Sequence, residues 1–198
     1  MINQIIKFIK NLYSQQECEV ETLDRAYFHE DDFRQIEFLP RDNYEFLQNE
    51  NLTIKNFADE HSDGFGFTDI HIREENQKSI ADQKIELSDL NSVLLELELE
   101  KIEEVFTGYG NHKEKCPNTI AYKFDRAEIF VVTEEKTVTD FFVTGFRHFD
   151  DAEIKIKLEN ILFQIGTKYN LVLNDWDLAE MIDLHDRKEI EKYLNGEL

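Results

Sequence analysis

Two neighbouring apolar runs in the second half of the chain constrain the fold more than any other feature of the sequence. Residues 127–133 and 138–146 are apolar at successive positions, so both faces of each extended run carry hydrophobic side chains. Strands with this pattern are covered on both sides of a sheet. The segment between them is short and polar, which predicts a hairpin loop. We therefore expect a β-hairpin in a sheet with other elements packed on both of its faces.

Helices are predicted from apolar spacing near 3.6 residues and from residues that cap helix ends. Ser88 predicts the start of a helix over residues 89–99. Asp150 or Asp151 predicts the start of another, and Asp186 and Gly196 predict the two ends of the last one. Apolar spacing alone predicts two more helices, over residues 1–13 and 42–57.

Further strands are predicted on both sides of the central hairpin. Residues 19–28 and 33–39 are expected to pair as a hairpin with an acidic tip, and Pro40 ends the second of them. A turn at residues 63–66 is expected to lead into a strand over 67–73, with Ile70 and Ile72 facing the core and His71 facing solvent. The other predicted strands cover residues 105–109, 170–173 and 180–184, with a loop over 108–118.

The order of these elements predicts an α+β fold. Strands joined by hairpins and mixed with helices indicate a mixed, largely antiparallel sheet with about five helices packed on it. The chain of 198 residues carries 16 Phe and 7 Tyr, which is enough apolar material for one core. No linker or internal repeat divides it, so we expect a single acidic domain over residues 1–198.

The formal net charge of −21 limits the partners that the chain can take. Binding to nucleic acid needs clustered Lys and Arg, and an anionic membrane surface repels a protein this acidic. A basic protein or a cation remains a natural partner. The same charge also serves solubility alone, and that alternative stays open.

Cysteine content and hydropathy lead us to expect a cytoplasmic protein. Cys18 and Cys116 are too few for a disulfide framework, and the N-terminus lacks the ordered zones of a signal peptide. No run approaches the ~18 apolar residues that a membrane span needs.

Two groups of residues offer an enzymatic or metal-binding alternative. His61, Asp63 and His71 combine residue types that ligate metals, and His148 beside Asp150 has the composition of a general base with its acidic neighbour. Simpler interpretations exist for both, because surface histidines are common and Asp150 serves equally as a helix cap. No other catalytic motif is present, so we predict no cofactor and no metal site.

The residues predicted to bind a partner lie in two acidic segments. The first is the tip of the expected hairpin, and the second surrounds the only tryptophan, which acts either as a recognition residue or as a cover over the edge of the core. The predicted partner-binding residues are Glu30, Asp31, Asp32, Asp175, Trp176 and Asp177.

The C-terminal segment carries a resemblance to known proteins. Residues 174–177, 182–188 and 193–194 resemble the tails of small uncharacterised bacterial proteins, some of which are similar to immunity proteins of polymorphic toxin systems. The resemblance implies a small, acidic, cytosolic and non-catalytic protein with a cognate toxin as its partner.

Three hypotheses follow for the function. The first is a non-catalytic, acidic protein-binding module, such as an immunity protein or inhibitor of a basic toxin. The second is an enzyme or metal-binding protein that uses His61, Asp63 and His71, or His148 and Asp150. The third is a structural or assembly protein, which a large exposed apolar patch or a stable homodimer would favour. The sequence leaves the oligomeric state open.

Overall fold

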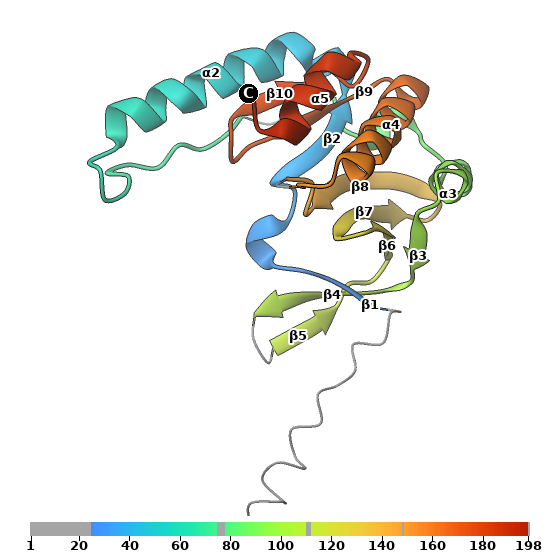
Figure 1. Ribbon diagram of the computed structural model, residues 1–198. Coiled ribbons are helices and arrows are strands. Elements are labelled where there is room, and N and C mark those ends of the chain that lie inside the picture. Colours follow the sequence, from blue (N-terminus) through green and yellow to red (C-terminus); the bar gives the residue numbers. More distant parts are fainter. Residues whose placement is uncertain (1–24, 75–77, 110–111, 148, 198) are drawn as a thin grey trace, which may run out of the picture.

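In the residues that the structure describes, two β-sheets and four α-helices form an α+β body, shown in Figure 1. The computed structural model describes residues 25–74, 78–109, 112–147 and 149–197. The helix predicted over residues 1–13 lies outside these residues. The other four predicted helices are all present, and the coarse prediction of an α+β fold with a largely antiparallel sheet is confirmed.

The large sheet has seven antiparallel strands in the order β10-β9-β2-β8-β7-β6-β3. Its predicted hairpin is confirmed as β7 and β8, which pair from Glu128 opposite Thr144 to Glu134 opposite Thr137. The strand bounds are β2 Ile36–Pro40, β3 Glu100–Ile102, β6 Thr119–Phe124, β7 Ala127–Glu134, β8 Thr137–Thr144, β9 Leu171–Asp175 and β10 Glu180–Ile182.

A small sheet of three strands packs beside the large one. It contains β1 (Arg25–Phe28), β4 (Glu104–Tyr109) and β5 (His112–Lys115). The prediction that residues 19–28 and 33–39 pair as a hairpin is wrong, because β1 pairs with β4 in parallel whereas β2 pairs with β8 and β9 in the large sheet. The prediction of a loop over residues 108–118 is wrong in part, because β5 forms there.

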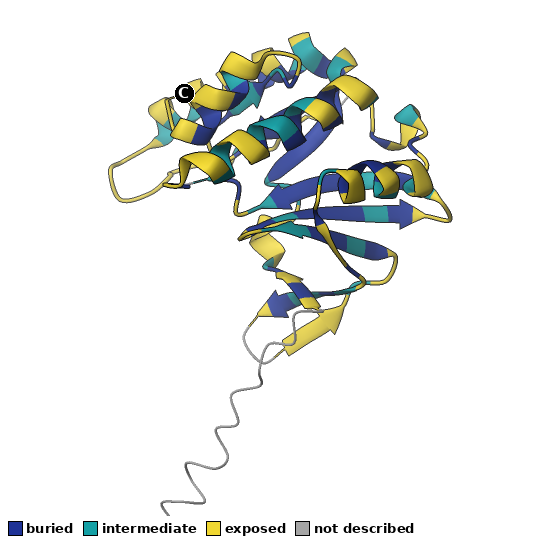
Figure 2. Cartoon of the chain, turned by 45° about the vertical axis from the view of Figure 1, so that its right-hand side comes forward, coloured by how far each residue is buried: buried dark blue, intermediate teal, exposed yellow. Residues whose placement is uncertain are grey.

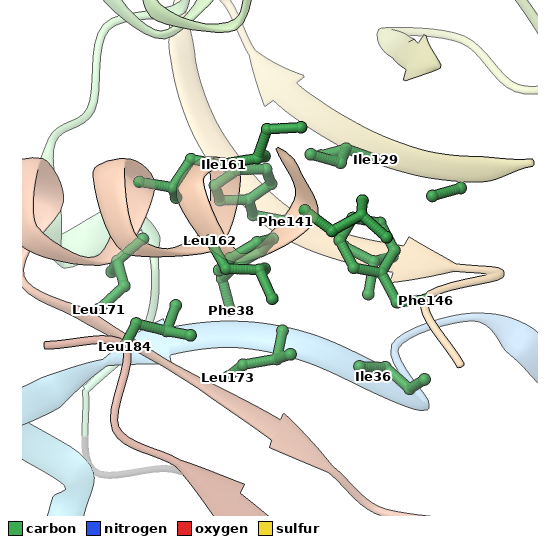
Figure 3. Close-up of a cluster of buried hydrophobic side chains, with 14 of the residues drawn as sticks. Ile36, Phe38, Ile129, Phe141, Phe146, Ile161, Leu162, Leu171, Leu173 and Leu184 are labelled. Atoms are coloured by element: carbon green, nitrogen blue, oxygen red, sulfur yellow. The ribbon is translucent and has the colours of Figure 1, made fainter. Parts of the chain in front are cut away.

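Three helices cover one face of the large sheet: α3 (Leu87–Glu96), α4 (Ala152–Tyr169) and α5 (Arg187–Asn195). The main core lies between them and the strands, where Phe38 and Phe141 stack with ring centroids 4.1 Å apart. Figure 3 shows this cluster, with Ile161 and Leu162 of α4 over the strand residues. The main core is therefore formed by one face of the large sheet together with all three helices.

The opposite face of the large sheet is covered by two different elements. The small sheet packs on Phe130 and Phe142, and α2 (Tyr44–His61) packs on Leu39 and Val172. Successive strand residues point to opposite faces, so neighbouring residues of one strand enter different clusters. Figure 2 shows the buried strands between the more exposed outer elements. Because other elements pack on both faces of the sheet, its central strands carry apolar side chains on both faces, as predicted.

The helix ends follow capping chemistry at three of the four predicted positions. Asp151 caps α4 by accepting from the backbone N–H groups of Glu153 and Ile154, and Asp186 caps α5, which ends at Gly196 with φ of 71°. The prediction for Ser88 is wrong: α3 begins at Leu87, so Ser88 lies inside the helix.

Candidate functional site

The two acidic segments singled out in the sequence lie next to each other in the fold. Glu30, Asp31 and Asp32 form a 3₁₀ turn, η1 (Glu30–Asp32), just before β2, and the tryptophan segment follows β9, the partner of β2. The two segments are joined directly, since the backbone N–H of Trp176 donates to the carbonyl of Gln35 at 2.9 Å. Asp32 and Asp177 consequently line one cleft of about 350 Å³, which we call the rim cleft.

The acids of η1 are exposed but held in a fixed arrangement. His29 caps the turn: its Nδ1 accepts from the backbone N–H of Asp31 at 3.2 Å, and its own backbone N–H donates to Asp32 Oδ2 at 3.2 Å. The Asp31 side chain is 92% exposed. We call Glu30, Asp31, Asp32 and Asp177 the acidic rim, because all four are exposed at the mouth of the rim cleft or next to it.

Asp175 lies beneath the rim and is fully buried. Desolvation by burial raises the pKa of its carboxyl, although the Tyr193 hydroxyl donates to Oδ2 at 2.8 Å and Arg147 Nε lies 3.5 Å from the same oxygen. Arg147 also donates to Asp177 at 2.6 Å. Asp175 therefore presents no surface to a partner and positions Arg147 under the rim.

Trp176 occupies the edge of the core. It is 8% exposed and packs with Leu39, Leu47 and Val172 between α2 and the sheet. Its Nε1 donates to Glu37 Oε1 at 2.8 Å. Of the two interpretations open at the sequence level, the structure shows the tryptophan as a cover over the core edge.

A second cleft of about 560 Å³, the central cleft, lies between the rim and the segment that follows α2. Its floor carries a chain of paired charges. Arg34 Nε donates to Glu37 Oε2 at 2.6 Å, and Arg34 Nη1 lies 3.3 Å from Asp140 Oδ1. Burial by itself would lower the pKa of Arg34, but Glu37 and Asp140 raise it above the ordinary value. Both carboxylates are therefore paired with the same arginine of the protein itself.

A β-bulge adjoins the central cleft. In the β7–β8 pair Val132 lies opposite Asp140 and Thr133 opposite Val138, so Thr139 is an extra residue in β8. Bulges change the direction in which side chains project, and they occur often next to functional sites. Both Thr139 and Asp140 line the cleft as a result.

The residues of the metal-binding alternative do not assemble into a site. His61 stacks on Phe57 at 4.2 Å, and the Asp63 carboxylate accepts from the backbone N–H groups of Phe65 and Gly66. His71 was expected to face solvent but is half-buried, with Nε2 3.0 Å from Glu50 Oε1. Within the described ranges no three side chains of His, Cys, Asp or Glu gather closely enough to hold a metal ion.

The general-base alternative gains no support from the geometry around α4. His148 lies outside the described residues. Asp150 is exposed, and its neighbour Asp151 provides the helix cap. Among the described residues, Asp150 forms no ion pair and no side-chain hydrogen bond.

Sequence reasoning missed an exposed apolar segment after α2. Phe65, Phe67, Ile70 and Ile72, which we call the apolar ridge, are 103%, 68%, 83% and 84% exposed. The predicted strand over residues 67–73 does not form, apart from an isolated bridge between Ser62 and Phe67. Ile70 and Ile72 point away from the core, so the predicted facing of this segment is reversed. The alternation of apolar and polar residues was the available signal, but it does not tell which set lies inside.

No helix in the described part of the chain is both long and apolar enough to traverse a lipid bilayer. Comparisons with protein-family models, curated proteins and solved structures found no match to the chain. The resemblance of the C-terminal segment to immunity proteins therefore stays a prediction.

Proposed function

We propose that this protein is a non-catalytic binding protein that receives a basic protein partner at the acidic rim. The observation that carries the proposal is that Asp32 and Asp177, which come from distant parts of the chain, line one cleft with Glu30 and Asp31 exposed beside them. A cytoplasmic toxin with a basic active site, such as a nuclease, is the partner class that the sequence resemblance implies.

The electrostatics of the rim support a role in association. Among the described residues, Glu30 has no ion pair, and Asp31 pairs with the ring of His29 alone. Exposed charge of one sign steers an oppositely charged partner and raises its association rate. A basic cleft that binds this surface is also closed to its own anionic substrate.

The paired charges of the two clefts favour binding over catalysis. A general acid or base must exchange a proton with a substrate. Glu37, Asp140 and Asp175 instead face arginines of the protein itself. The arrangement favours a fixed surface in which half-buried arginines pair with Glu37, Asp140 and Asp175, and in which Glu30 and Asp31 of the rim have no Arg or Lys partner among the described residues.

The proposal is tested with an oligolysine peptide as the basic probe. We expect a titration followed by NMR to shift first the amide signals of η1 and of residues 175–178. A Glu30→Gln/Asp31→Asn variant should bind about 10-fold more weakly at low salt, because surface charge acts chiefly through steering and is screened by salt. The matched control is Glu134→Gln/Glu135→Gln, which removes the same charge from the exposed β7–β8 loop.

The opposite results are equally clear. Equal weakening by the rim variant and the control, or shifts scattered evenly over the exterior, would overturn the proposal. Affinity that does not change with salt would overturn it as well.

A second candidate, a structural or assembly role, is favoured by the apolar ridge, because large exposed apolar patches mark interaction sites. Sedimentation of the protein alone tests it: a stable homodimer supports assembly, and a monomer at high concentration contradicts it.

A further inference from the structure

Specific hydrogen bonds hold the apolar ridge in its conformation. At its tip the Asp63 carboxylate accepts from the backbone N–H groups of Phe65 and Gly66, at 2.9 and 3.0 Å, and Ser62 bridges to Phe67. The hairpin-like turn formed in this way projects beyond the end of α2 (Figure 1). The turn therefore holds two phenylalanines in solvent, where the described part of the chain leaves them largely uncovered.

Three contacts fix the returning half of the ridge against the body of the protein. His71 Nε2 and the backbone N–H of Glu74 lie 3.0 and 3.2 Å from the same oxygen, Oε1 of the buried Glu50 on α2. Arg73 lies over the ring of Trp176, 4.5 Å from its centroid. Because His71 and Arg73 face inward, the residues that alternate with them, Ile70 and Ile72, face outward.

The four apolar side chains of the ridge are exposed to water, so the free energy that their burial would contribute is not gained in the protein alone. Burying one large apolar side chain contributes about 1.5–3 kcal/mol, and the ridge exposes four within eight residues. In the described part of the chain, no other stretch of eight residues exposes four large apolar side chains. A partner that covers the ridge gains that burial.

The charges around the ridge indicate the chemistry of that partner. In the part of the chain that the structure describes, none of the surrounding carboxylates pairs with a Lys or Arg side chain. These carboxylates belong to Asp59, Glu60, Asp63, Asp69 and Glu74. Arg73, which directly precedes Glu74, instead lies over the ring of Trp176. A second copy of the chain would place like charges against each other, which is unfavourable.

We propose that the ridge docks a polypeptide segment whose apolar side chains are flanked by Lys or Arg. The inference rests on the proposed function, because the ridge adds apolar anchors for the same basic partner. The central cleft connects the two surfaces: Phe33 and Arg34, which follow the rim, line it together with Arg73 and Glu74, which end the ridge. One basic chain crossing this cleft contacts both.

The two surfaces have separate kinetic effects. Rim charges act on the association rate, whereas buried apolar contacts act on the dissociation rate. Changes in the ridge are therefore expected to speed dissociation with little effect of salt.

The test uses a synthetic peptide of alternating Leu and Lys, and a matched peptide with Ser in place of Leu. We expect Ile70→Ser/Ile72→Ser to weaken binding of the Leu–Lys peptide by about 10-fold or more, through loss of apolar burial. The control is Leu95→Ser/Ile156→Ser, which removes two exposed apolar side chains from α3 and α4 and should bind as the wild type does. The Ser–Lys peptide should not distinguish the ridge variant from the wild type.

Failure of this inference is distinguishable from failure of the proposed function. If the ridge variant binds the Leu–Lys peptide as tightly as the wild type while Glu30→Gln/Asp31→Asn weakens both peptides, the ridge inference is overturned and the rim proposal stands. If the rim variant has no effect on either peptide, the proposed function fails. A wild-type homodimer that the ridge variant abolishes would show that a second copy covers the ridge, and would also overturn the inference.

Discussion

The indole of Trp176 and the carboxylate of Glu37 form a buried hydrogen bond that joins the end of β9 to β2. The bond from Nε1 to Oε1 is 2.8 Å long, and the two residues are 8% and 4% exposed. Arg34 occupies the other carboxylate oxygen of Glu37. The floor of the central cleft and the position of the rim segment both depend on this contact, because Trp176 directly precedes Asp177.

Replacing Trp176 with Phe tests the contact. The variant keeps an aromatic ring but removes the donor to a buried carboxylate, which should lower the free energy of unfolding by about 1–3 kcal/mol. Urea unfolding followed by circular dichroism measures the change. A Phe65→Leu variant, at a side chain that is 103% exposed, serves as the control with a small expected effect. Unchanged stability in Trp176→Phe would show that the hydrogen bond contributes nothing net.

Replacing Tyr193 with Phe tests the buried carboxylate below the rim. The variant removes the donor to Asp175, and we expect a loss of about 1–3 kcal/mol near neutral pH. Burial raises the pKa of Asp175 in the folded protein, so the folded state binds this proton more tightly than the unfolded chain does. Stability contributed by Asp175 therefore increases as pH falls from neutral through the raised pKa.

The cost of Tyr193→Phe should accordingly be largest where Asp175 is ionised and smaller where it is protonated. Unfolding free energies measured across acidic to neutral pH check this dependence. Tyr109→Phe, at a ring that is 74% exposed, should behave as the wild type at every pH. A cost for Tyr193→Phe that grows towards acidic pH would contradict the assignment.

Replacing Asp183 with Asn gives the opposite pH dependence. Arg41 donates to both carboxylate oxygens, at 2.6 and 3.2 Å, and its hydrogen bond holds the pKa of Asp183 below the usual value of 3.8. This stabilisation is complete above the unfolded pKa and is lost as pH falls through the lower folded pKa. Because Arg41 is half-exposed, we expect a cost of about 0.5–1 kcal/mol at pH 7.

The difference between wild type and Asp183→Asn should narrow as the solution is acidified below pH about 4. Thermal or urea unfolding over that range measures it, with Asp42→Asn as a control at an exposed acid near Arg41. A difference that stays constant with pH would mean that the ion pair is not its source.

Replacing Gly166 with Ala tests the packing of α4 on the segment before α5. A Cβ at Gly166 would lie 2.1 Å from Leu184 Cβ, so the helix must shift, at a cost of about 1–3 kcal/mol. Gly66→Ala is the matched control, because a Cβ there meets no atom within 4 Å. Equal stability of the two variants would show that α4 moves freely against Leu184.

The sequence predicted those elements whose signals are local. The β7–β8 hairpin, the cap at Asp151 and both ends of α5 follow from neighbouring residues, and all are confirmed. The pairing of β1 was missed because its partner is β4, and no pattern of residues near position 28 indicates which strand that partner is. Ser88 was misassigned because a serine near a helix start is equally compatible with the first turn.

The candidate site was predicted in composition but not in arrangement. Acidic residues at 30–32 and 177 are visible in the sequence, whereas their shared cleft depends on the pairing of β2 with β9. The burial of Trp176 and the exposure of Ile70 and Ile72 depend on how α2 and the sheet divide the apolar surface between them. A single sequence does not show which apolar side chains pack between α2 and the sheet and which stay exposed.

The position of β2 between β8 and β9 has a consequence for synthesis of the protein. Pro40 pairs with Leu171 and Glu37 with Phe142. β2 is therefore synthesised well before the two strands that flank it in the sheet. Contacts between residues so far apart in the chain slow folding, and a chain still being synthesised leaves the edges of β2 open. We expect ribosome-bound chains that end before β9 to stay protease-sensitive around β2, and the sheet to close only when the last quarter of the chain emerges.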